Sequence, residues 1–359
     1  MNTSKIERKF DILRTFVSIA IALGLALIVV AFISDDPFDT IQKFLLGPMS
    51  SQRRMFNVIE LMIPLIFTGV AMCIVQQAAM INLIADGAFY IAASFATYIA
   101  LNTTLPVGIH PIFILIISMI VGGLCGMIPA VLKVKWKANE VVSSIMMNYV
   151  LAFLGLYILN YHMKDISVGF NASFELPESA KLPIILPKTR LHFGIFIVLA
   201  VVVLSYFLLY KSKWGYEMRM TGENANFARY SGINVKKVIL YASFLSGAIA
   251  GLGGGTEILG MYSRFQWEKS PGYGWDGIMV AILAKNNPAL VPLAAFFLAY
   301  LRIGADILSR DAGIPVEFAS VIQGLIIILI AAEMFLSGLK HKAITKESQK
   351  MMAKQEGGN

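Results

Sequence analysis

Long apolar segments separated by short polar ones dominate the pattern of this chain. Nine of them approach the roughly 20 residues that a helix needs to cross the hydrocarbon core of a bilayer. They cover residues 13–33, 57–75, 86–102, 110–132, 140–162, 191–210, 237–254, 289–307 and 317–336. Their residues do not alternate as in the strands of a membrane barrel. Because lipid offers no partner to an unpaired backbone group, the pattern predicts a bundle of membrane-spanning helices.

Basic residues at both ends of the chain predict its topology. Four of them surround the start of the first apolar run, and five lysines follow Leu339: Lys5, Arg8, Lys9, Arg14, Lys340, Lys342, Lys346, Lys350 and Lys354. Lys and Arg favour the cytoplasmic side, so both termini lie inside and the number of crossings is even. We therefore predict a tenth crossing in 270–284, where a short helix pairs with the glycine-rich stretch before it.

The expected architecture is an all-α polytopic membrane protein of about ten transmembrane helices, one of them short and broken. A cytoplasmic N-terminus, 1–12, precedes a membrane domain, 13–339, and a cytoplasmic tail, 340–359, follows it. A polar loop over 34–56 and a longer polar insertion over 163–190 are expected outside the cell. Three prolines limit regular structure in the second, which is either a docking surface for an external partner or a passive loop.

Composition agrees with a membrane protein and restricts its chemistry. Hydrophobic residues make up 57% of the 359 and charged residues only 14%, which is far more apolar than a soluble domain. The net charge of +8 does not indicate nucleic-acid binding, because the basic residues lie largely at span ends and no soluble domain could carry a basic groove. Cys73 and Cys125 lie inside apolar runs, where buried thiols are expected rather than a disulfide or a metal site.

The internal segment 211–237 is plainly water-soluble. It holds six basic residues against two acidic ones, which places it in the cytoplasm. Its middle, from Glu223 to Gly232, predicts a short helix that a glycine ends. A helix this short is unstable in water unless another surface packs against it. We therefore expect this segment to bind a partner.

Two polar groups interrupt apolar segments in the first half of the chain. Asn82 and Asp86 either face a polar cavity at membrane depth or lie in a short cytoplasmic turn. Glu140, Ser144 and Asn148 are spaced four apart and share one stripe of a helix. That stripe forms either an interhelical hydrogen-bonding seam or the wall of a solute path, and we favour the path.

Glycines mark several helices. Gly122 and Gly126 form a small-xxx-small pair that predicts close helix packing. The run Gly247–Gly255 lacks the spacing of a nucleotide-binding loop, so we expect close packing and a broken helix there. Asp86-Gly87 and Asp276-Gly277 recur in comparable settings, as a trace of duplication or by coincidence.

The segments 138–149, 270–277 and 285–288, with Gly222 to Gly232 between them, resemble the permease subunits of ATP-binding-cassette importers. The similarity is greatest to the nucleoside and simple-sugar branch, which is related to the ribose and branched-chain amino-acid permeases. It implies one half of a type II importer in the bacterial plasma membrane. It also implies a second homologous permease, in a heterodimer, a cytoplasmic ATPase that holds ATP and Mg²⁺, and an external substrate-binding lipoprotein. This chain itself would bind no cofactor.

By the same resemblance, the helix between Gly222 and Gly232 would be the coupling helix that enters a cleft of the ATPase. Its residues are Gly222, Asn224, Ala225, Ala228, Arg229, Tyr230 and Gly232. Around Asn82 the family-like pattern is Asn, apolar, Gly, apolar, Glu, Gly, Gln. This chain has Ile84 at the first Gly position, Asp86 at the Glu position and Ala88 at the Gln position. An asymmetric permease pair would accommodate this departure.

A neutral polar solute fits the composition of the spans. Apart from Arg302, which Asp306 can pair with, the spans offer almost no cation at mid-depth for an anionic solute. A nucleoside base could stack on Phe89, Tyr90, Tyr273 or Trp275, although a simple sugar is the alternative. The expected path residues are Asn82, Asp86, Phe89, Glu140, Ser144, Asn148, Glu257, Tyr273, Trp275 and Asp276.

Three other classes of membrane protein fit the sequence less well. An intramembrane aspartyl protease would use two membrane aspartates, but Gly274-Trp-Asp276 lacks the Gly-x-Gly-Asp arrangement of such enzymes. A zinc protease is excluded because no His-Glu-x-x-His helix is present. An ion-coupled secondary transporter is the stronger rival, since broken helices and a membrane acid such as Glu257 suit it. Such a carrier does not require the cytoplasmic segment 211–237.

Overall fold

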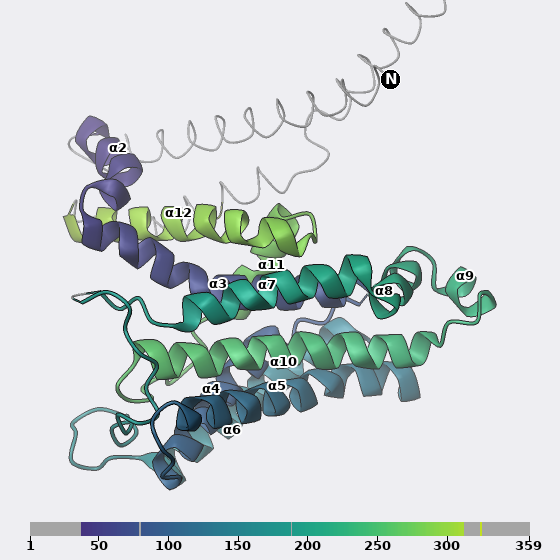
Figure 1. Cartoon of the computed structure of the whole chain (residues 1–359), viewed down its shortest axis with the longest axis horizontal. Helices are drawn as coiled ribbons and strands as arrows, with labels where there is room; N and C mark the ends of the chain where they lie inside the picture. The colour runs from purple at the N-terminus through teal and green to yellow at the C-terminus, as the bar shows by residue number, and fades with distance from the viewer. Residues whose placement is uncertain (1–36, 79, 188, 312–323, 325–359) are drawn as a thin grey trace, which may run out of the picture. The chain divides into compact units, whose positions relative to one another are not determined.

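A computed structural model describes residues 37–78, 80–187, 189–311 and 324 (Figure 1). The chain divides into two compact units, one formed by residues 1–50 with 301–359 and the other by residues 51–300. Across the described residues the regular structure is helical, and β-pairing is limited to two isolated bridges, Lys164 with Ser173 and Ile184 with His192. The predicted spans 13–33 and 317–336, and both predicted cytoplasmic ends, lie outside the described residues, apart from residue 324.

Most of the helices belong to the second unit. They are α3 (Gln52–Gln77), α4 (Ala85–Asn102), α5 (Ile109–Trp136), α6 (Glu140–Ile158, extended by a π turn over Leu159–Met163), α7 (Gly194–Lys211), α8 (Lys213–Glu223), α9 (Ala225–Tyr230), α10 (Val235–Met261), α11 (Tyr273–Leu283) and the short η3 (Pro288–Leu290). The first unit contains α2 (Pro37–Leu46) and η1 (Gly47–Met49), and α12 (Val291–Asp311) begins in the second unit and ends in the first.

The prediction of an all-α polytopic membrane protein is confirmed. Among the described residues, six helical segments are long and apolar enough to cross a membrane, namely Gln52–Gln77, Ile109–Trp136, Glu140–Met163, Gly194–Lys211, Val235–Met261 and Pro288–Arg310. Each predicted full-length span that falls in the described region coincides with a helix, and the short apolar helix expected before Lys285 is α11. The total of about ten crossings stays a prediction.

The segment 34–56 was expected to be a polar loop, and this was wrong. Helix α2 occupies its centre, where Lys43 and Asp39 form an ion pair of 2.5 Å one turn apart. Helix α3 begins at Gln52, because the Ser51 hydroxyl caps it by accepting a hydrogen bond of 3.2 Å from the Arg54 amide. The ion pair of α2 and the cap of α3 are local features that hydropathy does not detect.

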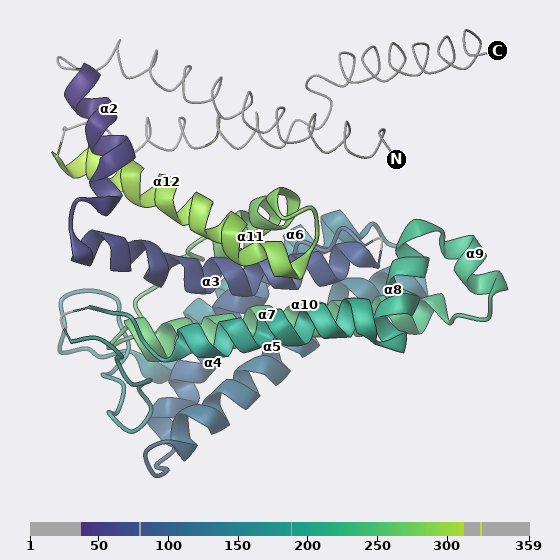
Figure 2. The same cartoon turned by 45° about the horizontal axis from the view of Figure 1, so that its top comes forward.

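Helix α10 is the centre of the second unit, where it packs against α3, α4 and α5 (Figures 1 and 2). The predicted close approach at Gly122 and Gly126 is confirmed. A Cβ atom at Gly122 would collide with the Gly247 carbonyl oxygen, and one at Gly126 would lie 2.7 Å from that of Ser243. The expected break in the Gly247–Gly255 run is absent, because α10 continues to Met261 and the glycines serve to admit neighbouring backbones.

The segment between α6 and α7 is held against the segment that follows α10. The Ser173 amide donates a 2.9 Å hydrogen bond to the Phe265 carbonyl, and the Leu176 amide donates one of 2.8 Å to that of Ser263. Asp165 accepts from the Ser167 hydroxyl at 2.5 Å and from the Arg264 guanidinium at 2.6 Å. These two hydrogen bonds hold the pKa of Asp165 at about 2, below its usual 3.8.

We expect Gly122→Leu to weaken the bundle, because a side chain there would force α5 and α10 apart. Overpacking of this kind costs about 1–3 kcal/mol of unfolding free energy. Denaturant unfolding of the purified protein in detergent measures the change. Gly169→Leu is the control, since no atom lies within 4 Å of a Cβ built at Gly169. Equal effects of the two variants would contradict the close crossing.

The depressed pKa of Asp165 predicts that the 164–193 segment loosens in acid. A carboxyl group whose pKa is lower in the folded state stabilises that state above its ordinary pKa of 3.8, and the contribution disappears as the pH falls toward about 2. Hydrogen exchange of the Ser173 and Leu176 amides should therefore speed up across this window. In Asp165→Asn the exchange should be fast already at pH 5, whereas the control Glu178→Gln, in the same segment, should follow the wild type.

Candidate functional site

The first turns of α4 and α11 lie against each other in the second unit. The amide of Gly274, at the start of α11, donates a 3.1 Å hydrogen bond to the carboxylate of Asp86, at the start of α4. A Cβ atom at Gly274 would collide with Asp86, so the two helix starts are in direct contact. Unpaired amides and the positive ends of helix dipoles gather at such starts, which suit polar solutes and acidic side chains. Asp276, in the first turn of α11, is also buried.

The polar stripe of α6 lies against the loop that precedes α4. Asn148 accepts a hydrogen bond of 2.9 Å from the Gly87 amide and donates one of 2.9 Å to the Leu83 carbonyl. The Ser144 hydroxyl accepts at 3.1 Å from the Leu83 amide. The stripe thus forms an interhelical hydrogen-bonding seam, and its additional part in a solute path stays a prediction.

Asn82 lies in the same loop and is fully buried. Its side-chain amide donates to the Gly126 carbonyl at 3.2 Å, and its side-chain oxygen accepts from the Ile84 amide at 3.2 Å. Asn82 and Asp86 are therefore both buried within the protein, and the choice between a polar cavity at membrane depth and a short cytoplasmic turn stays a prediction. Glu140, at the start of α6, differs from its two stripe partners, because it forms an ion pair of 2.6 Å with Lys133 of α5.

Aromatic rings pack beside the meeting point of α4 and α11. The ring of Phe89 lies 5.4 Å from that of Tyr273 and 6.0 Å from that of Trp267, between centroids. The hydroxyl of Tyr90 donates a 2.7 Å hydrogen bond to the Trp267 carbonyl. The structure thus brings together the predicted residues Phe89 and Tyr273, while Trp275 is 43% exposed.

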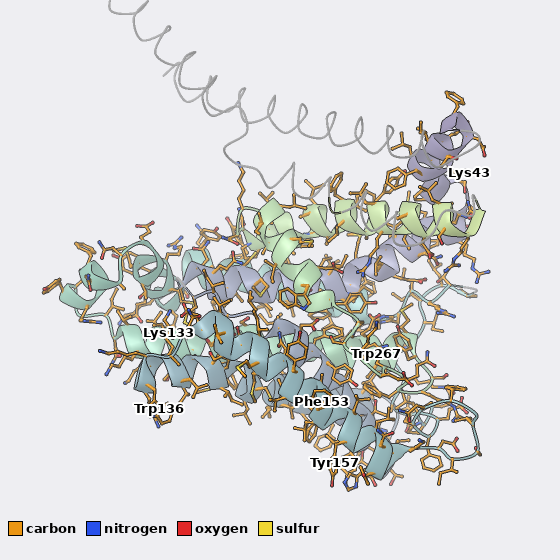
Figure 3. All side chains as sticks on the ribbon, turned by 180° about the vertical axis from the view of Figure 1, so that it is seen from behind. Lys43, Lys133, Trp136, Phe153, Tyr157 and Trp267 are labelled. Carbon is orange, nitrogen blue, oxygen red and sulfur yellow. The ribbon has the colours of Figure 1, made fainter. Side chains whose placement is uncertain are left out.

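Trp267 is a member of this aromatic cluster that the sequence analysis missed (Figure 3). It lies in the non-helical segment after α10 and is 8% exposed. The available signal was a tryptophan between two polar residues, Gln266 and Glu268, just beyond the end of an apolar run. Glu257, on α10, is buried as well, and its Oε2 atom has no hydrogen-bond partner among the described residues.

The segment predicted to couple to a partner forms two short helices, α8 and α9, at one end of the second unit (Figure 2). Asn224 separates them and caps α9, because its side-chain oxygen accepts at 3.0 Å from the amides of both Asn226 and Phe227. Gly222 therefore belongs to the last turn of α8 rather than to the predicted single helix. Gly232 follows α9 with φ of +83°, a left-handed conformation that favours glycine, as predicted.

Helix α9 buries one side chain and exposes the others. Ala228 is fully buried, whereas Phe227 is 55% and Tyr230 92% exposed. Ala225 and Arg229 are exposed as well. A pocket of about 340 Å³ lies at the base of the helix, lined by Trp214, Glu217, Met218, Gly232, Ile233, Asn234, Lys237, Val238 and Tyr241. The tip of α9 thus presents two aromatic rings that the described part of the chain leaves exposed.

Comparison with known proteins identifies what the chain is similar to. Residues 54–331 match the model of the family described as branched-chain amino acid transport system / permease component. A glucose ABC transporter permease of Haloferax volcanii is 31% identical, over 88% of this chain and 86% of that protein. A guanosine ABC transporter permease of Bacillus subtilis is 33% identical, over 75% and 78%. A nucleoside ABC transporter permease of Lactococcus lactis is 26% identical, over 90% and 92%.

We expect Asn148→Leu to destabilise the seam between α6 and the loop before α4. The substitution leaves the Gly87 amide and the Leu83 carbonyl buried without partners, and each such group costs about 1–3 kcal/mol. Denaturant unfolding in detergent measures the loss of unfolding free energy. Tyr149→Leu is the matched control, because that neighbouring side chain is 65% exposed. A loss no larger than that of the control would contradict the seam.

Proposed function

This chain belongs to the family of branched-chain amino acid transport system permease components, and we propose that it is the membrane subunit of an ATP-driven importer of nucleosides. The guanosine and nucleoside permeases among its relatives support this solute. The glucose permease, at similar identity, makes a simple sugar the second candidate. ATP and Mg²⁺ are bound by a partner ATPase, and a second permease and an external lipoprotein complete the importer.

The observation that carries the proposal is the form of helix α9. A helix of six residues gains little stability from its own hydrogen bonds. Here the Asn224 cap and the buried Ala228 hold it in place, while Phe227 and Tyr230 remain uncovered. Exposed aromatic side chains are typical anchors of protein interfaces. We propose that α9 enters a cleft of the ATPase and transmits its movement to α10, which begins at Val235.

The solute is proposed to bind where α4 and α11 begin. The lysines and arginines of the described spans lie near helix ends, apart from Arg302. A phosphorylated solute would therefore lack a compensating cation. Hydroxyl groups of a ribose or hexose suit the helix starts beside Asp86. Phe89 and Tyr273, which are buried against each other in this conformation, would stack on a base once the helix starts separate. We propose that the remaining expected path residues, Asn82, Glu140, Ser144, Asn148, Glu257, Trp275 and Asp276, line the route from this point.

We expect the double variant Phe227→Ala, Tyr230→Ala to uncouple the importer. Truncation of a hot-spot residue costs an interface about 2 kcal/mol or more, so ATP-driven uptake should fall more than tenfold if the two rings anchor α9 to the ATPase. The measurement is uptake of radiolabelled guanosine by proteoliposomes that contain the complete importer and ATP. Phe153→Ala is the matched control, since that aromatic side chain on α6 is 70% exposed (Figure 3).

Two outcomes would contradict the proposal. Uptake that persists without ATP would favour an ion-coupled carrier. Equal uptake by the α9 variant and the Phe153 control would remove α9 from the coupling. Parallel uptake of glucose and of guanosine by the wild type decides between the two solutes, and competition by unlabelled adenosine or ribose separates recognition of the base from recognition of the sugar.

A further inference from the structure

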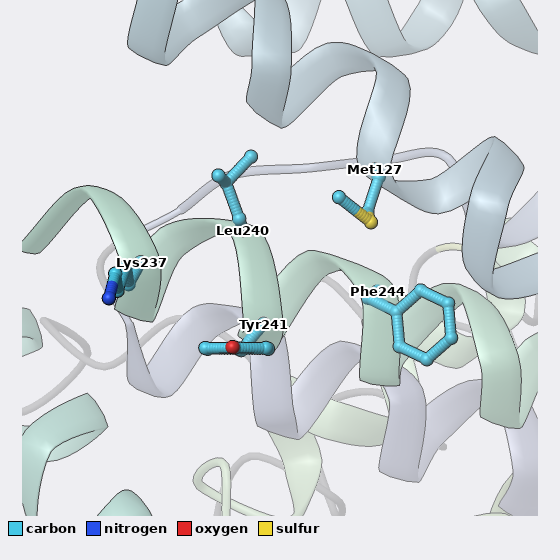
Figure 4. A pocket seen from close by; sticks show the side chains of 5 residues that line it. All are labelled: Met127, Lys237, Leu240, Tyr241 and Phe244. Atoms are coloured by element: carbon cyan, nitrogen blue, oxygen red, sulfur yellow. The ribbon is translucent and has the colours of Figure 1, made fainter.

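An apolar groove between α5 and α10 adjoins the pocket at the base of α9, with which it shares Lys237 and Tyr241. It has a volume of about 390 Å³, which is within the range of pockets that bind organic ligands (Figure 4). Its lining residues are Met127 of α5 and Lys237, Leu240, Tyr241 and Phe244 of α10. Lys237 is the one charged residue among them.

The groove runs along α10. Residues 237, 240, 241 and 244 recur at helical spacing and share one face, which extends about 10 Å along the axis. The ring of Phe244 packs over Gly123, where a Cβ atom would lie 2.6 Å from it. Because glycine has no side chain, the surface of α5 is recessed beneath this ring. The groove therefore offers an elongated apolar surface that starts at an ammonium group.

Positive charge gathers at that end of the two helices. Gly126 approaches Ser243 and Gly122 approaches Gly247, so α5 and α10 are antiparallel, and the lysines that end α5 lie level with those that begin α10. Lys133 is neutralised by Glu140. Lys237 is exposed and has no ion-pair partner among the described residues, and Lys135 lies over the ring of Trp136.

Aromatic side chains mark the level of the membrane surface at the same end. Trp136 is 69% exposed, and the rings of Trp214 and Tyr241 stack 5.8 Å apart while both remain more than half exposed. Trp and Tyr are enriched where the membrane meets water, and the basic residues indicate the cytoplasmic face. Anionic lipids are concentrated in that leaflet, where they attract Lys and Arg near the surface.

We infer that this groove binds an anionic phospholipid, whose phosphate lies at Lys237 and whose acyl chain lies along Leu240, Phe244 and Met127. Charge complementarity favours this occupant over a second permease. A homologous permease with a similar basic end would bring like charges together, whereas an anionic headgroup neutralises Lys237. The apolar wall favours a lipid over a free phosphate, which would use only the ammonium group.

Native mass spectrometry of the complete importer tests the site. The protein is purified in detergent, mixed with phosphatidylglycerol or phosphatidylcholine of identical chains, and the number of retained lipids is compared. The wild type should retain one more phosphatidylglycerol than Lys237→Gln, whose affinity should be about fivefold lower, because one lysine contributes about 1 kcal/mol near an anionic surface. Lys236→Gln, one position away and outside the groove, should retain the wild-type number.

Several results would overturn the inference. Equal retention of the two lipids would show that the headgroup charge is not recognised. Equal losses in the Lys236 and Lys237 variants would show only general attraction to a basic surface. Displacement by inorganic phosphate at low millimolar concentration would indicate a phosphate site. Crosslinking of Phe244→Cys to a second permease would show that protein, and not lipid, covers the groove.

Discussion

Backbone that is not helical inside a membrane protein must find its hydrogen bonds within the protein, and the second unit depends on this constraint. In the loop before α4, Ser144 and Asn148 of α6 supply hydrogen bonds to the backbone of Leu83 and Gly87. Asn82 bonds to the Ile84 amide and ties the loop to the backbone of α5. At the start of α11, the Gly274 amide finds its partner in the carboxylate of Asp86. Because these bonds are made, two helices can begin in the interior of the bundle and leave their polar starts facing each other.

Helix α10 connects this interior to the segment that we propose couples to the ATPase. It begins three residues after Gly232, and its glycine-rich part lies against the backbones of α4 and α5. Gly254, for example, approaches the Phe89 carbonyl so closely that a side chain would collide with it. A continuous helix that packs tightly transmits a displacement more directly than a broken one. The absence of a break in α10 therefore suits the proposed coupling better than the interruption that the glycine run predicts.

The sequence predicts those features that depend on composition along a single segment. Apolar runs located the spans in the described region, and Gly122 with Gly126 marked the close crossing. Contacts between distant residues were not predictable in this way, since the Asp86–Gly274 hydrogen bond joins residues 188 positions apart. The stripe of Ser144 and Asn148 was identified, but its partner was not, because an amide bonds equally well to a solute or to a loop. Short helices such as α2 were missed because hydropathy does not detect a cap or an ion pair.

The position of α9 relative to the membrane and the ATPase tests the account most directly. Tyr230→Cys can be introduced after Cys73 and Cys125 are replaced by Ala, and its reaction followed in intact cells and in membranes that contain the importer. We predict that a membrane-impermeant maleimide leaves the new cysteine unmodified in intact cells, and that a short bifunctional crosslinker joins it to the ATPase in opened membranes. Modification from outside the cell, or a cysteine that reaches no ATPase, would contradict the account.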